Sequence, residues 1–309
     1  MRRGMGLATF YHGAGFTGAG EVYLASRVAV AGLPDGRVEI LSASTEMGQG
    51  AQTVFTQIAA ERLDFPPTEV VVAVPDTHRV PDSGPTVASR TSMVVGKILD
   101  NACTDLATQV GDRALRGTAL RDAIREWHRS HPDEELVAEA EYERPPGVVW
   151  DDDNYRGAAC GAFAWAAYLA EVEVDLRTYS ARCTAFHSVQ EIGHVINETL
   201  ARGQIQGGIV RGIGWALFEE CRLRDGAMIN NQLTNYIIPT SADVPPIDVV
   251  FLENPYADGA LGAKGIGELP LDGPAPAVAN AVADALGVEP LDIPLTPERL
   301  MQLVEGVGT

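Results

Sequence analysis

The hydrophobic pattern of this chain changes its period several times, which limits the folds that the chain can adopt. Alternating runs over residues 21–30 and 37–42, separated by a turn at 34–36, predict a β-hairpin. Residues 52–63 instead carry apolar side chains at helical spacing, and residues 70–74 form a β-branched run typical of a strand. This succession of hairpins and helices predicts an α+β fold.

The middle of the chain has the composition of a linker. Residues 144–153 combine two prolines and a glycine with three aspartates. Beyond them, alternating runs over 168–175 and 180–189 predict a second hairpin, and residues 199–220 predict a glycine-rich apolar helix. Further helices are predicted over residues 92–115, 122–131 and 275–286. The linker divides the chain into two predicted mixed α/β subdomains, residues 1–148 and 149–309.

Charge and cysteine content exclude several classes of function. Acidic residues outnumber basic ones by 42 to 23 among 309 residues, and the net charge of −19 repels phosphate backbones and anionic lipids. We therefore expect neither a nucleic-acid partner nor a membrane partner. The four cysteines are too far apart in sequence for an iron–sulfur cluster or a structural zinc site. Few cysteines and no secretory leader predict a cytoplasmic protein.

Three patterns resemble ligand or membrane motifs, and we interpret them as structural. Residues 13–18 fit GxGxxG, but the alternating run that follows is not the helix that a dinucleotide site requires. His128 and His131 lie one helical turn apart without a third ligand at a suitable spacing, which favours solvated side chains over a metal site. The pairs Gly203-xxx-Gly207 and Gly208-xxx-Gly212 predict a buried helix that lets a ligand or a backbone segment come close, in a stretch too short to span a bilayer.

Three loops rich in glycine, serine or threonine each precede a predicted helix. They cover residues 46–50, 86–92 and 262–268. Helix starts carry unpaired N–H groups and partial positive charge, which hold anionic groups. An ordinary turn with a helix cap explains any one loop alone. Together, in an acidic chain, they predict a bulky, polar, anionic cofactor held by main-chain amides rather than by lysines.

Glu268 closes the third of these loops. A carboxylate in a narrow, glycine-lined site loses water, which raises its pKa and makes it a usable general base. The residues alone therefore single out Glu268 as a candidate catalytic group.

Six motifs in a fixed order resemble the molybdenum-cofactor-binding chain of the xanthine dehydrogenase family of molybdenum hydroxylases. They are E-M-G-Q-G at 46–50, P-D-S-G-P-T-V-A-S-R-T at 81–91, E-I-G-H-V-I-N at 191–197, G-Q-I-Q-G-G-I-V-R-G-I-G at 203–214, Y-I-I-P-T at 236–240 and G-A-K-G-I-G-E at 262–268. Their order and spacing resemble the second half of the family's large subunit from about Arg3 onward. The implied fold is the cofactor-binding domain of the xanthine oxidase family.

The resemblance implies a catalytic base and a set of cofactor-binding residues. Glu268 matches the family's catalytic base, which takes a proton from the molybdenum-bound hydroxyl group. Gln49 would lie against the pterin or the oxo group of the metal, and Gln204 would contact the cofactor. The implied cofactor-binding residues are Gly48, Gln49, Gly50, Ala88, Ser89, Arg90, Thr91, Gln204, Lys264 and Gly265. No side chain is implied as a metal ligand, since the pterin dithiolene holds the molybdenum.

The implied activity is hydroxylation of an electron-poor carbon of an N-heterocycle with oxygen from water. The sequence is most similar to members of the purine and nicotinate dehydrogenase type, although aldehyde-oxidising members share the core motifs. A non-catalytic cofactor carrier or assembly protein that kept the fold is the alternative from another class. The implied cofactor is the molybdenum–pterin group in its cytosine dinucleotide form.

The resemblance also implies partner subunits. The first half of the family's large subunit, its iron–sulfur cysteines and its flavin domain have no counterpart in these 309 residues. The implied protein is half of a split molybdenum subunit, active only with the other half, an iron–sulfur subunit and a subunit that carries FAD. Two residues depart from the family pattern: Glu191 stands where Asp is more common, and His194 where a basic residue is more common.

Overall fold

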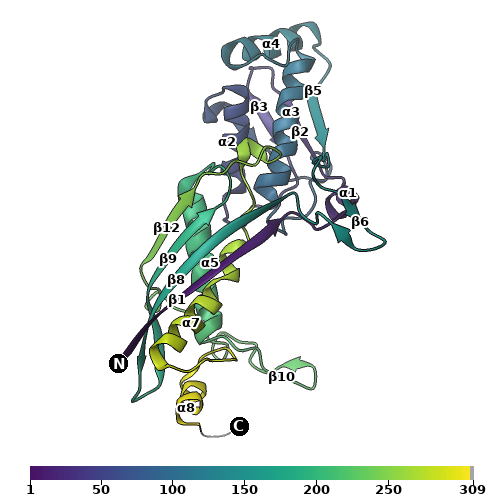
Figure 1. Ribbon diagram of the computed structural model, residues 1–309. Helices are drawn as coiled ribbons and strands as arrows, with labels where there is room; N and C mark the ends of the chain where they lie inside the picture. The colour runs from purple at the N-terminus through teal and green to yellow at the C-terminus, as the bar shows by residue number, and fades with distance from the viewer. Residues whose placement is uncertain (307–309) are drawn as a thin grey trace.

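The chain folds into two α+β units placed end to end, which give the molecule an elongated shape (Figure 1). A computed structural model describes residues 1–306. The first unit contains the four-stranded sheet β4-β3-β2-β5, and the second contains the four-stranded sheet β1-β8-β9-β12. Among the described residues, none of the helices combines the length and the hydrophobicity needed to cross a bilayer.

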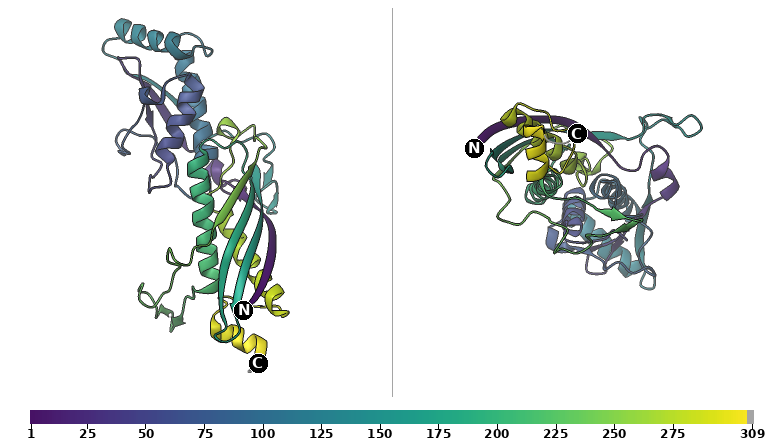
Figure 2. Two further views of the ribbon diagram at one scale, coloured as in Figure 1. Left: turned by 90° about the vertical axis from the view of Figure 1, so that its left-hand side faces the viewer. Right: turned by 90° about the horizontal axis from the view of Figure 1, so that it is seen from below.

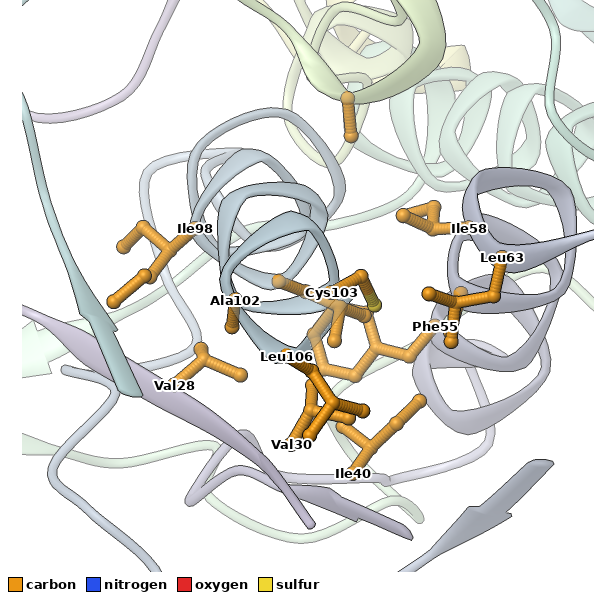
Figure 3. Close-up of a cluster of buried hydrophobic side chains, with 14 of the residues drawn as sticks. Val28, Val30, Ile40, Phe55, Ile58, Leu63, Ile98, Ala102, Cys103 and Leu106 are labelled. Atoms are coloured by element: carbon orange, nitrogen blue, oxygen red, sulfur yellow. The ribbon is translucent and has the colours of Figure 1, made fainter. Parts of the chain in front are cut away.

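The first unit packs its helices against one sheet. The strands are β2 (Arg27–Gly32), β3 (Val38–Leu41), β4 (Val70–Val72) and β5 (Leu136–Glu141), and the helices are α2 (Ala51–Leu63), α3 (Gly96–Gln109) and α4 (Gly117–Ser130). β2 pairs antiparallel with β3, which confirms the first predicted hairpin. Figure 3 shows apolar side chains of the sheet, such as Val30 and Ile40, in contact with Phe55 of α2 and Leu106 of α3. Their burial stabilises the unit, since each fully buried side chain of this size contributes about 1.5–3 kcal/mol.

The second unit has two long helices on one face of its sheet (Figure 2). The strands are β1 (Arg2–Ala14), β8 (Ala162–Asp175), β9 (Ser180–Glu191) and β12 (Ile247–Leu252), and the helices are α5 (Glu198–Leu217), α6 (Leu269–Asp272), α7 (Pro274–Leu286) and α8 (Pro297–Glu305). β8 and β9 form the second predicted hairpin. Tyr168 and Phe186 point from the sheet into the core shared with Ile209 of α5 and Val278 of α7.

Glycines let the helices of the second unit approach each other closely. A Cβ atom on Gly208 would lie 2.4 Å from Pro270, and one on Gly212 would lie 2.7 Å from Pro274. Both distances are below van der Waals contact, so α5 can pack against the segment 269–274 only because these residues are glycines. The predicted close approach is therefore confirmed at Gly208 and Gly212, with backbone and proline rings as the neighbours. At Gly203 and Gly207 it is not found, because a Cβ atom there would meet no close neighbour among the described residues.

Short elements complete the fold. They are α1 (Gly20–Leu24), the 3-10 turns Pro67–Glu69 and Ala260–Gly262, a π-helical turn at Thr91–Val95, and the strand pairs β6 (Trp150–Asp151) with β7 (Arg156–Gly157) and β10 (Leu223–Arg224) with β11 (Ala227–Met228). The expectation of a strand from residue 21 is wrong, because residues 20–24 form α1. The carboxylate of Glu21 on this helix is buried, a placement that the alternating pattern did not indicate.

The first strand belongs to the sheet of the second unit. β1 pairs along its whole length with β8, from Arg2 opposite Val174 to Ala14 opposite Ala162. The chain passes between the two sheets in the segment predicted as a linker, whereas β1 lies in the sheet of the second unit. The division into subdomains at residue 148 remains a prediction about folding behaviour.

Candidate functional site

A cavity of about 410 Å³ is lined by residues of both units. Its size falls within the range of about 300 to 1,000 Å³ that is typical of small-molecule sites. All three loops predicted from sequence contribute to its wall. The predicted residues that line it are Gln49, Ala88, Ser89, Arg90, Thr91, Gln204, Lys264, Gly265 and Glu268. Gly48 and Gly50 do not line it.

The first loop binds its own carboxylate. Both oxygens of Glu46 accept backbone N–H groups, with distances of 2.7 Å to Gly48, 3.1 Å to Gly50 and 3.0 Å to Gln52. Partial burial raises the pKa of Glu46, but these amides outweigh it, so the pKa lies below its ordinary value. The prediction that these amides are open to an anionic cofactor is therefore wrong for Gly48 and Gly50. The side chain of Gln49 also bonds within the loop, to Met47 and Thr45.

The second loop has an unusual backbone at its tip. Ala88 and Ser89 have φ angles of 52° and 53°, in the left-handed region that residues other than glycine rarely adopt. The backbone N–H of Gly15 donates to the carbonyl of Ala88 at 2.8 Å. Gly265 of the third loop lies so close that a Cβ atom there would be 1.7 Å from the Ser89 carbonyl oxygen. Strained backbone of this kind is common at functional sites, where its surroundings must hold it in place.

Arg90 directs its side chain into the protein. The guanidinium group is fully buried and donates to both carboxylate oxygens of Glu21, at 2.9 and 2.7 Å. It also donates to Ser26 Oγ at 2.8 Å and to the Ser83 carbonyl at 2.9 Å. Its charge is therefore neutralised internally, so the guanidinium group is not available to a ligand in the cavity.

Lys264 is held in a similar way. Its ammonium group donates to both oxygens of Glu191, at 2.8 and 2.7 Å, and to the Phe163 carbonyl at 3.1 Å. The side chains of Lys264 and Glu191 are 8% and 13% exposed. This ion pair fixes the third loop to the end of β9, and its geometry explains why a carboxylate is needed at residue 191.

Glu268 sits where the second loop, the third loop and β1 meet. Ser89 Oγ donates to Glu268 Oε2 at 3.0 Å and accepts the backbone N–H of Glu268 at 3.0 Å. His12 Nε2 lies 3.2 Å from the same carboxylate oxygen, and His12 Nδ1 lies 2.8 Å from Asp272 Oδ2. We call these four residues, His12, Ser89, Glu268 and Asp272, the Glu268 cluster.

The environment of Glu268 differs from the sequence expectation. Its side chain is 53% exposed, so these residues do not provide the desolvation that was predicted for it. Its hydrogen bonds to Ser89 and its contact with His12 position the carboxylate instead. Both contacts involve Oε2, and within residues 1–306 no hydrogen bond engages Oε1.

Helix α5 also lines the cavity. Asn197 caps its start by accepting the backbone N–H of Leu200 at 3.0 Å. Gln204 lies two turns further on and lines the cavity, and no hydrogen bond within the described part of the chain holds its side-chain amide. The open donors of the site are therefore neutral amide and hydroxyl groups. Across residues 1–306, no three His, Cys, Asp or Glu side chains converge as metal ligands.

His12 is the site residue that sequence reasoning missed. It lies on β1, and its partners are 256 and 260 residues away in the sequence. No local pattern indicates such a contact. The one usable signal is a histidine on a glycine-rich strand end, which does not predict a role.

Comparison with known proteins identifies the family of this chain. The model of the family described as the molybdopterin cofactor-binding domain matches residues 1–245. A xanthine dehydrogenase molybdenum-binding subunit of Escherichia coli is 31% identical over 98% of this chain and 42% of its own length. The 6-hydroxypseudooxynicotine dehydrogenase complex subunit gamma of Paenarthrobacter nicotinovorans is 30% identical over 88% of this chain and 37% of its own length.

A solved structure shows the same fold. The aldehyde oxidoreductase of Desulfovibrio gigas superposes with a TM-score of 0.85 over 98% of this chain and 32% of that protein, at 25% identity. The chain thus spans less than half the length of each of the three proteins to which it is similar.

Proposed function

This chain belongs to the molybdopterin cofactor-binding domain family, together with xanthine dehydrogenase molybdenum-binding subunits, and we propose that it forms part of the active site of a molybdenum-dependent oxidoreductase. In this role the cavity of about 410 Å³ holds the molybdenum–pterin cofactor. The observation that carries the proposal is the convergence of Gln49, Ser89, Gln204 and Glu268 on that cavity.

The residues that remain open to the cavity fit a polar pterin. Arg90 and Lys264 are neutralised by carboxylates, so recognition falls to the Gln204 amide, to hydroxyl groups such as that of Thr91 and to the backbone of the 88–91 loop. Gly265 lets the second and third loops touch, and a side chain there would separate them. When bound, the cofactor supplies the redox centre that takes two electrons from the substrate and activates the water whose oxygen is inserted.

Glu268 acts as the general base. Ser89 holds Oε2, which directs the carboxylate and leaves Oε1 to accept the proton that the activated water loses. Half of the side chain is exposed in this chain. Full catalytic strength therefore requires that cofactor, substrate and a covering protein surface exclude water from the carboxylate.

A covering partner is also supported by the sheet of the second unit. One face of this sheet carries α5 and α7 (Figure 2), whereas the other exposes apolar side chains. Tyr11, which is 58% exposed, packs against Trp165 with ring centroids 4.8 Å apart. Exposed clusters of this kind mark interaction surfaces. We propose that the other half of the molybdenum subunit, an iron–sulfur subunit and a subunit that carries FAD complete the enzyme in the cytoplasm.

We propose an N-heterocycle of the purine or nicotinate type as substrate, hydroxylated at an electron-poor carbon. The names of the relatives from E. coli and P. nicotinovorans support this class. The similarity to the D. gigas protein supports an aldehyde as the alternative substrate. The geometry around Glu268 argues against a mere cofactor carrier, because a carrier does not need a positioned base. The cytosine dinucleotide form of the cofactor completes the proposal.

Purification of the chain from its native source tests the proposal. The sample is assayed for molybdenum, pterin nucleotide, iron and flavin, and then for turnover of purines, pyridines and aldehydes. We expect about one molybdenum per chain, partner subunits that contain iron and flavin, and oxidation of an N-heterocycle. A chain that binds the cofactor but has no redox partners and no turnover would contradict the proposal and support the carrier.

A further inference from the structure

His12 lies between two carboxylates that belong to one short segment. Glu268 immediately precedes α6 and Asp272 is its last residue, a spacing of four that brings side chains to the same side of a helix. His12 Nε2 is 3.2 Å from Glu268 Oε2, and His12 Nδ1 is 2.8 Å from Asp272 Oδ2. The ring thus links the proposed base to a second carboxylate at the edge of the site.

The chemistry of the ring determines where protons must lie. A neutral imidazole has one N–H group and one lone pair, and a carboxylate oxygen only accepts. If Nδ1–H donates to Asp272, a neutral Nε2 would place its lone pair against Glu268 Oε2. The 3.2 Å contact is attractive only when a proton lies between these two atoms, either on His12 or on Glu268.

On the basis of the proposed role of Glu268, we propose that His12, oriented by Asp272, is a positioning residue that shares a proton with Glu268. When His12 carries the proton, Glu268 is ionised and ready to accept another at Oε1. After Glu268 has accepted it, His12 releases a proton through Nδ1 toward Asp272, whose side chain is 38% exposed. The ring keeps its Nε2–H toward Glu268 Oε2, Glu268 loses the Oε1 proton to solvent, and Asp272 returns its proton to Nδ1, so each cycle moves one proton to solvent and restores all three groups.

The surroundings of His12 support this exchange. The charged groups that contact the ring are Glu268 and Asp272, while the paired residue on β8 is Ala164. Ser89 Oγ donates to Glu268 Oε2 as well. That second donor keeps the carboxylate in place while the proton moves to and from the ring.

The first test uses the full chain without cofactor. Its six histidines are labelled with nitrogen-15, and the His12 signals are assigned by their loss in His12→Gln. We expect Glu268→Gln and Asp272→Asn each to change the protonation pattern of the two His12 ring nitrogens at neutral pH, with Glu126→Gln on α4 as the control. Ring nitrogens that respond to neither variant would overturn the proposal.

The second test uses the assembled enzyme. We expect His12→Ala to lower kcat about 10- to 100-fold, the usual effect of losing a supporting partner, with KM and molybdenum content unchanged. Added 4-methylimidazole should restore part of the rate, whereas His12→Gln, which keeps a donor but cannot exchange a proton, should remain slow. Full activity in His12→Gln would overturn the proposal. If His12→Ala retains full activity but Glu268→Gln does not, the proton sharing fails and the role of Glu268 as base stands.

Discussion

Two kinds of charged side chain lie close together in the second and third loops of this site. One kind is buried in ion pairs, and the other is exposed to solvent. Arg90 and Lys264 are buried against Glu21 and Glu191. Glu268 remains 53% exposed, next to the hydroxyl of Ser89 and the ring of His12. Buried ion pairs fix loops, because breaking one leaves a charge without compensation. An accessible carboxylate can instead exchange protons with a substrate.

The position of a residue in a sequence motif therefore does not determine what its side chain does. Ser89 and Arg90 are adjacent, yet one contacts the proposed base and the other holds the loop from inside. Lys264 and Glu268 differ in the same way within the third loop: Lys264 holds the loop from inside through a buried ion pair, and Glu268 is the proposed base. The buried pairs hold the loops rigidly, and the rigid loops keep the residues of the Glu268 cluster in position.

The largest stability effect is expected where a buried pair is broken. Arg90→Met leaves the Glu21 carboxylate buried without its partner, so we expect a loss of about 3–5 kcal/mol in the free energy of unfolding. Denaturant unfolding of the full chain measures it. The double variant with Glu21→Gln should recover part of the loss, and Arg129→Met, in an exposed pair with Glu126, should change little. If Arg90→Met alone were as stable as the parent chain, the buried pair would not have the stabilising role given to it here.

A smaller loss is expected where the loops touch. Gly265→Ala places a Cβ atom 1.7 Å from the Ser89 carbonyl oxygen, and overpacking of this kind costs about 1–3 kcal/mol. Because the clash moves Ser89 away from Glu268, the cofactor content of the assembled enzyme should fall as well. Gly147→Ala is the matched control, because its Cβ atom would meet no other atom within 4 Å. Equal stability and cofactor content in both variants would show that the loop contact is unimportant.

The smallest effect is expected at Glu46 and depends on pH. Its pKa is lower in the folded chain than its ordinary value of 4.5, so its contribution to stability is present above that pH and is lost as the pH falls through the lowered pKa. We expect Glu46→Gln to lower Tm near pH 7, with the gap to the parent narrowing below pH 4.5. Thermal unfolding at a series of pH values measures it. A gap that stays constant with pH would contradict the role of the carboxylate.

Local periodicity was sufficient to predict much of the fold. The helix predicted over 52–63 is observed at Ala51–Leu63, and both hairpins are present, since hairpins and amphipathic helices depend on neighbours in the sequence. β1 was not predicted, because its partner β8 begins at Ala162 and no local pattern records that pairing.

The loops of the site could be predicted, but the tasks of their side chains could not. Arg90 and Lys264 take their partners from Glu21 and Glu191, 69 and 73 residues away. The desolvation expected for Glu268 also depends on what covers the loop, which its own glycines do not determine.

Replacement of Glu268 by Gln in the assembled enzyme tests the central claim most directly. Turnover, molybdenum and pterin are measured on the same sample, with Glu126→Gln on α4 as the control. The amide keeps the size of the side chain but cannot accept the proton, so we expect full cofactor content and turnover lowered by about 10²- to 10⁴-fold. Turnover within a few-fold of the parent at full molybdenum content would show that Glu268 is not the base.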